Sequence, residues 1–274
     1  MKNLYIVVLA IFALASCATI SKINTYEGTL DRSIMPGASE AKALAIGNHQ
    51  EFILENGMKV YVIENSKLPT ISYSLGFDTD PIVEGAKAGY LSMTGSLIEA
   101  GTTNRTKQKL DEEIDFMGAN IGAYASGLYA SGLSKYNNKI LDIMSDMALN
   151  PLMPQAELDK QITETITGLK SSETDADAIM GNVKGLVYYG INHPYGEFMN
   201  EATVKNITLE DCKKHYNTYF KPNNALLTIV GDITLEEAKK LVTEKFGNWK
   251  RGEVPTHTYA APVKPTSPQV YVVN

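Results

Sequence analysis

Cysteine is scarce, because the 274 residues contain only Cys17 and Cys212. Cys17 directly follows an apolar N-terminal run, which leaves Cys212 alone in the remainder of the chain. An internal disulfide is therefore excluded there, and with it a small disulfide-stabilised scaffold. Cys212 lies in an amphipathic stretch, TLEDCKKHYNTYF. We expect it to be a small core residue and not a nucleophile.

Basic residues are in the minority, with 25 Lys and Arg against 31 Asp and Glu and a net charge of −6. No cluster of Lys and Arg stands out along the chain. Because phosphate backbones are bound by basic surfaces, we expect no nucleic acid partner. The 44% hydrophobic and 20% charged residues are typical of a globular protein of one large or two small domains.

Long apolar runs are limited to the N-terminus. Residues 4–15 are apolar but too few to span a bilayer, which predicts a signal peptide over residues 1–16. The Leu-Ala-Ser-Cys that ends this segment resembles the bacterial lipobox, so we predict lipidation of Cys17; a plain signal peptide is the alternative. We expect a tether over 17–48 and a membrane attachment through the lipid anchor, in the bacterial cell envelope on the periplasmic side of the outer membrane.

Hydrophobic periodicity predicts an α+β fold with helices packed on a largely antiparallel sheet. Thr208 and Asp211 are spaced as a helix capping box, and Thr234 is a second predicted N-cap. The predicted strands are residues 58–64, 70–77, 120–134 and 223–233. The predicted helices lie within 88–103, 106–119, 139–151, 154–190 with a break near 171–177, 208–220 and 234–249.

The helix within AGYLSMTGSLIEAGTT (88–103) lacks the chemistry that its spacing would allow. Ser92, Gly95 and Ser96 follow the i, i+3, i+4 pattern in which a helix presents two zinc ligands and a general base. A neutral Ser hydroxyl is a poor zinc ligand, and neither Gly nor Ser serves as a base at neutral pH. The four histidines have no metal-ligand spacing among themselves; we place His193 in a structural turn and expect the other three to be solvated or half-buried.

Several segments together resemble the insulinase, or pitrilysin-type (M16), metallopeptidase family, over about residues 51–249. They are NGMKVYVIEN, GTTNRT, DFMGANIGAYAS, HPYG and ITLEDCKKHYNTYFKPNNALLTIVGDI. The resemblance implies an M16 metallopeptidase-like, ferredoxin-like-related N-terminal domain over 49–252. QVYVVN near the end echoes KVYVIEN, so residues 253–274 are interpreted as a linker and the first strand of a second, truncated repeat.

Active members of that family carry His-x-x-Glu-His on this helix, and the motif falls on Ser92, Gly95 and Ser96. The resemblance therefore implies a member that has lost the zinc motif, with no catalytic residues there and no metal cofactor. Small residues at these positions predict an open, uncharged cavity where the zinc would lie. The third zinc ligand of the family corresponds to Glu173, which is either a vestigial ligand position or an ordinary surface residue.

The resemblance also implies a place for peptide. In active relatives an edge strand adds the substrate as a further strand through main-chain hydrogen bonds, a mode that needs no catalytic residue. The corresponding residues here are Ile121, Gly122, Ala123, Tyr124 and Ala125. An ordinary sheet strand is the alternative for this segment.

These observations favour a catalytically inactive M16 homologue, exported as a lipoprotein. It would bind peptides, or act as the hetero-partner of an active M16 zinc peptidase in peptide degradation. One alternative is an active zinc metalloendopeptidase with a rearranged site that uses Glu173, Glu99 and a distant histidine. The other is a structural scaffold of the envelope that has no affinity for peptides.

Overall fold

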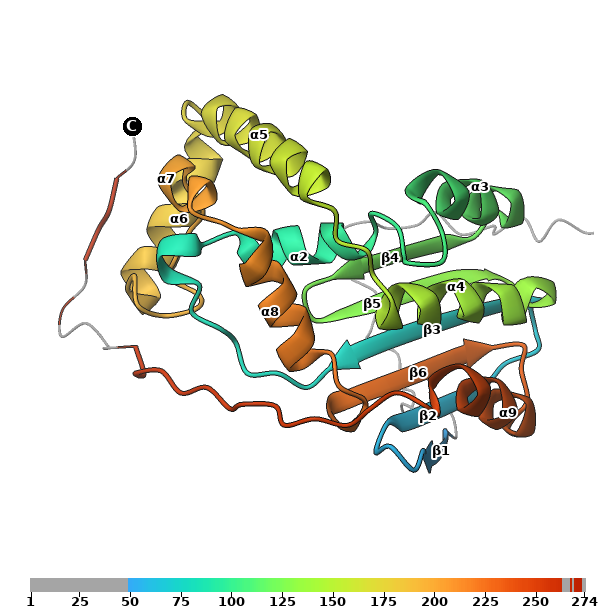
Figure 1. Ribbon diagram of the computed structural model, residues 1–274. Helices are drawn as coiled ribbons and strands as arrows, with labels where there is room; N and C mark the ends of the chain where they lie inside the picture. The colour runs from blue at the N-terminus through green and yellow to red at the C-terminus, as the bar shows by residue number, and fades with distance from the viewer. Residues whose placement is uncertain (1–48, 263–266, 268, 273–274) are drawn as a thin grey trace, which may run out of the picture. The chain divides into compact units, whose positions relative to one another are not determined.

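A computed structural model of the chain describes residues 49–262, 267 and 269–272. The predicted signal peptide, Cys17 and the tether lie outside the described residues. Within them the fold is α+β, as predicted, with a six-stranded sheet in the order β1-β2-β6-β3-β5-β4 (Figure 1). The strands are β1 Gln50–Ile53, β2 Lys59–Glu64, β3 Thr70–Phe77, β4 Asn120–Tyr124, β5 Gly127–Leu133 and β6 Ala225–Gly231.

The sheet is largely antiparallel, since only the β2–β6 pair among its ladders is parallel. Alternation along β3 explains how the sheet packs, because Ile71, Tyr73 and Leu75 are buried while Ser72 and Ser74 are exposed. The buried face is covered by α4 and α9, which lie on the same side of the sheet (Figure 1). The core of the domain therefore lies between this face and the helices.

The α-helices follow the predicted segments closely. The long helix is interrupted as predicted, because α5 ends at Ser172 and α6 begins after Asp175, whose carboxylate caps the backbone N–H groups of Asp177 and Ala178. The capping box of Thr208 is also confirmed. The helices are α2 Tyr90–Ile98, α3 Lys107–Met117, α4 Asn137–Leu149, α5 Gln155–Ser172, α6 Ala176–Tyr189, α7 Glu201–Lys205, α8 Leu209–Tyr219 and α9 Leu235–Phe246.

Three features differ from the sequence interpretation. Segment 120–134 is a hairpin of β4 and β5 and not one extended strand, and its turn lies at residues 125–126. The short elements β1 and α7 were not predicted from the sequence, because they are too brief to give a periodic signal. Residues 269–272 belong to no helix or strand, and a second repeat beginning there stays a prediction.

Candidate functional site

Helix α2 carries the three motif positions and is fixed at its start by a carboxylate. The Glu84 side chain accepts hydrogen bonds from the backbone N–H groups of Gly89, at 3.0 Å, and of Leu91, at 2.8 Å. These groups have no partner within the helix, and the positive end of the helix dipole favours an anion there. Burial of the carboxylate raises the pKa of Glu84 in spite of these bonds.

Gly95 brings α2 into direct contact with the backbone of β4. Gly95 is buried, and a Cβ built on it would lie 2.6 Å from Cα of Tyr124 and 3.1 Å from the backbone nitrogen of Ala125. Real Cβ atoms do not approach another atom as closely as 2.6 Å, so no side chain fits at position 95 without a shift of the strand. The predicted open cavity is therefore wrong at this position, because the β4 backbone fills the space that a side chain would use.

The other two motif positions lie at the surface of α2. Ser92 is exposed and Ser96 is half-buried, and the Ser96 hydroxyl donates to the carbonyl of Ser92, one helical turn earlier, at 3.5 Å. With Gly95 enclosed and two hydroxyls beside it, the residues at these positions do not fit a zinc ion. Across the described part of the chain, no three His, Cys, Asp or Glu side chains are grouped so that they could hold a metal ion.

Glu173 is an exposed residue at the C-cap of α5. It lines a hollow of about 260 Å³ with residues of α5 and α6 and of the segment that leads into α7. Its lining includes Lys170 and Glu201, whose Nζ and Oε2 atoms are 4.0 Å apart. The motif positions of α2 are not among the residues that line it. The assignment of Glu173 as a vestigial ligand position stays a prediction, with an ordinary surface residue as the alternative.

The predicted peptide-binding residues Ile121–Tyr124 lie in β4, which is an edge strand of the sheet, and Ala125 begins the turn to β5. Glu99, at the C-cap of α2, already binds this edge: its Oε1 accepts a hydrogen bond from the Ala123 N–H at 2.5 Å. A peptide adding to β4 would need the same N–H group as its donor. Glu99 therefore occupies the main-chain donor that a peptide added to β4 would use.

His215 of α8 holds the end of the same strand. Its Nε2 lies 2.8 Å from the carbonyl oxygen of Ala125. A carbonyl oxygen only accepts, so the Nε2–H group donates this hydrogen bond. The ring is buried beside Tyr90 and Tyr219, and Nδ1 has no hydrogen-bond partner. Burial lowers the pKa of His215, although the hydrogen bond to Ala125 acts in the opposite direction. The expectation that this histidine is solvated or half-buried is wrong, because α8 packs against α2 and encloses it.

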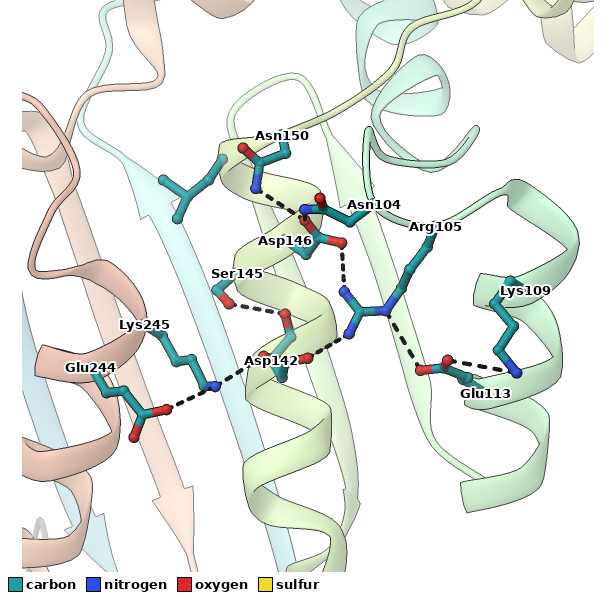
Figure 2. Close-up of a pocket in the computed structure, with 11 residues that line it drawn as sticks. Asn104, Arg105, Lys109, Glu113, Asp142, Ser145, Asp146, Asn150, Glu244 and Lys245 are labelled. Carbon is teal, nitrogen blue, oxygen red and sulfur yellow. Dashed lines mark hydrogen bonds and ion pairs between the residues drawn. The ribbon is translucent and has the colours of Figure 1, made fainter.

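The loop between α2 and α3 is held by one buried carboxylate, Asp146 of α4. Asp146 accepts hydrogen bonds from Thr102 at 2.7 Å, Asn104 at 2.6 Å, Arg105 at 2.5 Å and Asn150 at 3.0 Å. Figure 2 shows Asn104, Arg105 and Asn150 converging on this carboxylate. Burial opposes its charge, but the hydrogen bonds outweigh burial and hold the pKa of Asp146 below its ordinary value.

The hollow beside this network has a volume of about 600 Å³. Its charges are paired with one another: Arg105 also contacts Asp142 at 2.5 Å, and Lys245 of α9 lies 2.9 Å from Asp142 and 3.0 Å from Glu244 (Figure 2). Three cationic and four carboxylate side chains line the hollow, and because most of them are paired with one another we interpret the network as structural. It ties the GTTNRT loop to α4 and α9, and thereby fixes the C-terminal end of α2.

Two family models and several individual proteins are similar to this chain. The model described as Insulinase (Peptidase family M16) matches residues 93–183, and that described as Peptidase M16 inactive domain matches residues 206–274. The chain is 26% identical over 235 residues to the Mitochondrial-processing peptidase subunit beta of Rattus norvegicus, an alignment that covers 82% of this chain and 48% of that protein. The chain thus spans about half the length of the curated relatives it matches.

Solved structures share the fold at low sequence identity. A peptidase M16 inactive domain from Pseudomonas fluorescens superposes with a TM-score of 0.69 at 20% identity, covering 80% of this chain and 54% of that one. The periplasmic protease PqqL from Escherichia coli superposes with a TM-score of 0.65 at 18% identity, covering 80% and 26%. In the described part of the chain, no helix combines the length and apolar character needed to cross a membrane.

Proposed function

Because the chain belongs to the M16 (insulinase) peptidase family, we propose that it is a non-catalytic M16 subunit that works with an active, zinc-binding M16 peptidase. The observation that carries this proposal is the contact between Gly95 and the β4 backbone. Gly95 stands where the family has its general base, and its environment leaves no space for that side chain. Ser92 and Ser96, where the family has its two histidine ligands, supply only hydroxyl groups.

The proposed role is to hold a partner or a substrate and not to cleave it. Support for pairing comes from the relative in Rattus norvegicus, which is named as a subunit of a processing peptidase. Peptide binding along β4 is the less favoured mode, because the Ala123 N–H and the Ala125 carbonyl are already bound by Glu99 and His215. Attachment to the envelope through a lipidated Cys17 belongs to the same proposal and is supported by the N-terminal sequence and by a fold neighbour that is periplasmic.

The test compares the chain alone with the chain together with an M16 peptidase that carries His-x-x-Glu-His and comes from the same organism. Zinc content is measured by elemental analysis, and cleavage of a fluorogenic peptide mixture is followed with and without a chelator. We expect the chain alone to contain less than stoichiometric zinc and to cleave nothing. With the peptidase, we expect a complex of defined stoichiometry and faster, chelator-sensitive cleavage.

The control replaces the motif Glu of the added peptidase with Gln, which should abolish cleavage but leave the complex intact. Stoichiometric zinc with chelator-sensitive cleavage by the chain alone would overturn the proposal in favour of an active enzyme with a rearranged site. A stable complex without any change in cleavage would instead favour a structural scaffold.

A further inference from the structure

A second hollow lies beside the Asp146 network. It has a volume of about 440 Å³, which is within the range of small-molecule sites in proteins. The two hollows adjoin one another, because Leu149, Asn150 and Lys245 line both. The second hollow is formed where the C-terminal ends of α4, α8 and α9 meet, together with the residues that follow α8 and α9.

Lysines supply all the charge that faces this second hollow. Within the described part of the chain its lining contains Lys221, Lys245 and Lys250 but no carboxylate, and we call it the lysine hollow. The neighbouring hollow is different, since four carboxylates line it and pair with most of its cations (Figure 2). Acidic residues outnumber basic ones in the whole chain, so three cations gathered without a carboxylate indicate a site for an anion.

Two of the three lysines are available to a ligand. Lys245 is already engaged, because its Nζ lies 2.9 Å from Asp142 and 3.0 Å from Glu244. Among the residues that the structure describes, Lys221 and Lys250 form no ion pair. Lys221 follows α8 and Lys250 follows α9, so the tertiary fold brings them to one hollow. An anion there would meet two ammonium groups that no carboxylate neutralises.

Aromatic side chains make up most of the apolar part of the lining. They are Tyr216, Phe220 and Trp249. Packing holds these rings in place, because the ring centroids of Tyr216 and Phe220 are 4.9 Å apart and those of Trp249 and Phe246 are 6.0 Å apart. The Tyr216 hydroxyl also donates to the carbonyl of Ala148 at 2.9 Å. Rings fixed in this way offer a surface on which a planar ligand can pack without first ordering the protein.

We propose that the lysine hollow binds a small organic phosphate, in which a phosphate monoester is attached to an aromatic ring. Lys221 and Lys250 would bind the phosphate, because two ammonium groups match the double charge of a monoester better than the single charge of a carboxylate. The ring would pack against Trp249 and its aromatic neighbours. A long polyanion is disfavoured, since it would extend over the neighbouring hollow and meet the four carboxylates there. The site is independent of the proposed pairing with an active peptidase.

The test uses the fluorescence of Trp249, which is the only tryptophan of the chain and lines the lysine hollow. Phenyl phosphate is titrated into the full chain, and calorimetry gives an independent dissociation constant. We expect a saturable change in emission. Inorganic phosphate lacks the ring and benzyl alcohol lacks the charge, so each should bind at least about tenfold more weakly. Benzoate carries the ring but only one charge, and it should bind at least about threefold more weakly.

The matched variants remove one positive charge each and keep most of the length of the side chain. Lys221→Gln and Lys250→Gln should each raise the dissociation constant for phenyl phosphate by about threefold, and the double variant should raise it by about tenfold. Lys67→Gln is the control, because it removes the same charge in the turn between β2 and β3, outside the lining. It should leave the dissociation constant unchanged.

Four results would overturn the proposal. The first is the absence of saturable binding of phenyl phosphate to the original chain. The second is binding that neither Lys221→Gln nor Lys250→Gln weakens. The third is inorganic phosphate binding as tightly as phenyl phosphate, because the aromatic lining would then contribute nothing. The fourth is benzoate binding as tightly as phenyl phosphate, because the double charge would then not be recognised.

Discussion

Gly95 of α2 lies against Tyr124 of β4 so closely that a Cβ at position 95 would be 2.6 Å from the Tyr124 Cα. Two further contacts join the same strand to its surroundings, from Glu99 to the Ala123 N–H and from His215 to the Ala125 carbonyl. Helix α2 and strand β4 therefore form a closed helix–strand joint at the position of Gly95.

Replacing Gly95 with Ala should destabilise the protein. Inserting a methyl group into a filled contact costs about 1–3 kcal/mol, which exceeds the gain of about 1 kcal/mol in helix propensity. Gly168→Ala in α5 is the matched control, because an added Cβ there meets nothing within 4 Å and should stabilise the helix slightly. Urea denaturation of both variants checks the sign, and equal stabilities would contradict the closed joint.

Restoring the two histidines and restoring the whole motif should have different effects. Ser92→His/Ser96→His adds side chains at surface positions, so the double variant should fold normally and bind zinc through an i, i+4 pair. The triple variant with Gly95→Glu as well should lose about 3 kcal/mol or more of stability, because the added side chain collides with the β4 backbone. Thermal unfolding and zinc titration measure both effects. A triple variant that is as stable as the double variant would show that β4 can move away.

Removing the carboxylate of Glu99 should release the edge of β4. Glu99→Ala leaves the Ala123 N–H without its partner, which should cost about 1–2 kcal/mol and speed hydrogen exchange at that amide. If the carboxylate also blocks peptide addition, the variant should bind a peptide mixture more tightly than the original chain. Glu112→Ala on the exposed side of α3 is the control for both measurements. Unchanged exchange at Ala123 would refute the contact.

How far the sequence could lead is illustrated by α2 and β4. The helix and its three degenerate positions were predictable, because periodicity defines the helix and the following Gly101-Thr102 fixes the alignment. The hairpin of β4 and β5 was missed, since the repeated Tyr-Ala-Ser-Gly-Leu lacks a strong turn signal. The joint between α2 and β4 depends on contacts between residues about 24–30 positions apart, such as Glu99 with Ala123. Local patterns do not reveal whether small residues line a cavity or a close packing contact. For the same reason they did not predict the burial of His215 or its hydrogen bond to Ala125.

Removing the buried carboxylate of Asp146 in α4 should destabilise the domain strongly, because this group holds the loop between α2 and α3. Asp146→Ala leaves Thr102, Asn104 and Arg105 without their common acceptor, and we expect a loss of about 2–4 kcal/mol. Asp111→Ala removes an exposed i, i+4 ion pair instead and should change stability by less than about 0.5 kcal/mol. Chemical denaturation at pH 7 compares the two. Similar losses for both variants would mean that the network does not hold the loop.

Protonation of His215 should make the protein less stable in mild acid. Its pKa is lowered in the folded state by burial, so the unfolded chain, with an ordinary histidine pKa near 6.5, binds the proton more readily. Stability is then complete above about pH 7 and falls as the pH drops through 6.5, levelling off below the folded pKa. The phenols of Tyr90 and Tyr219, which face the ring, stay neutral throughout because burial raises the pKa of both.

The measurement is the free energy of unfolding at pH 7.5 and pH 5.5 for the original chain and for His215→Gln. We expect the original to lose about 1 kcal/mol more than the variant between these pH values, since one pH unit below the unfolded pKa limits the effect to about 1.4 kcal/mol. The Gln amide can still donate to Ala125, so the variant should keep the strand in place at both pH values. His49→Gln, at an exposed position, should retain the full pH dependence of the original chain. Equal pH dependence in His215→Gln and the original chain would show that another group titrates.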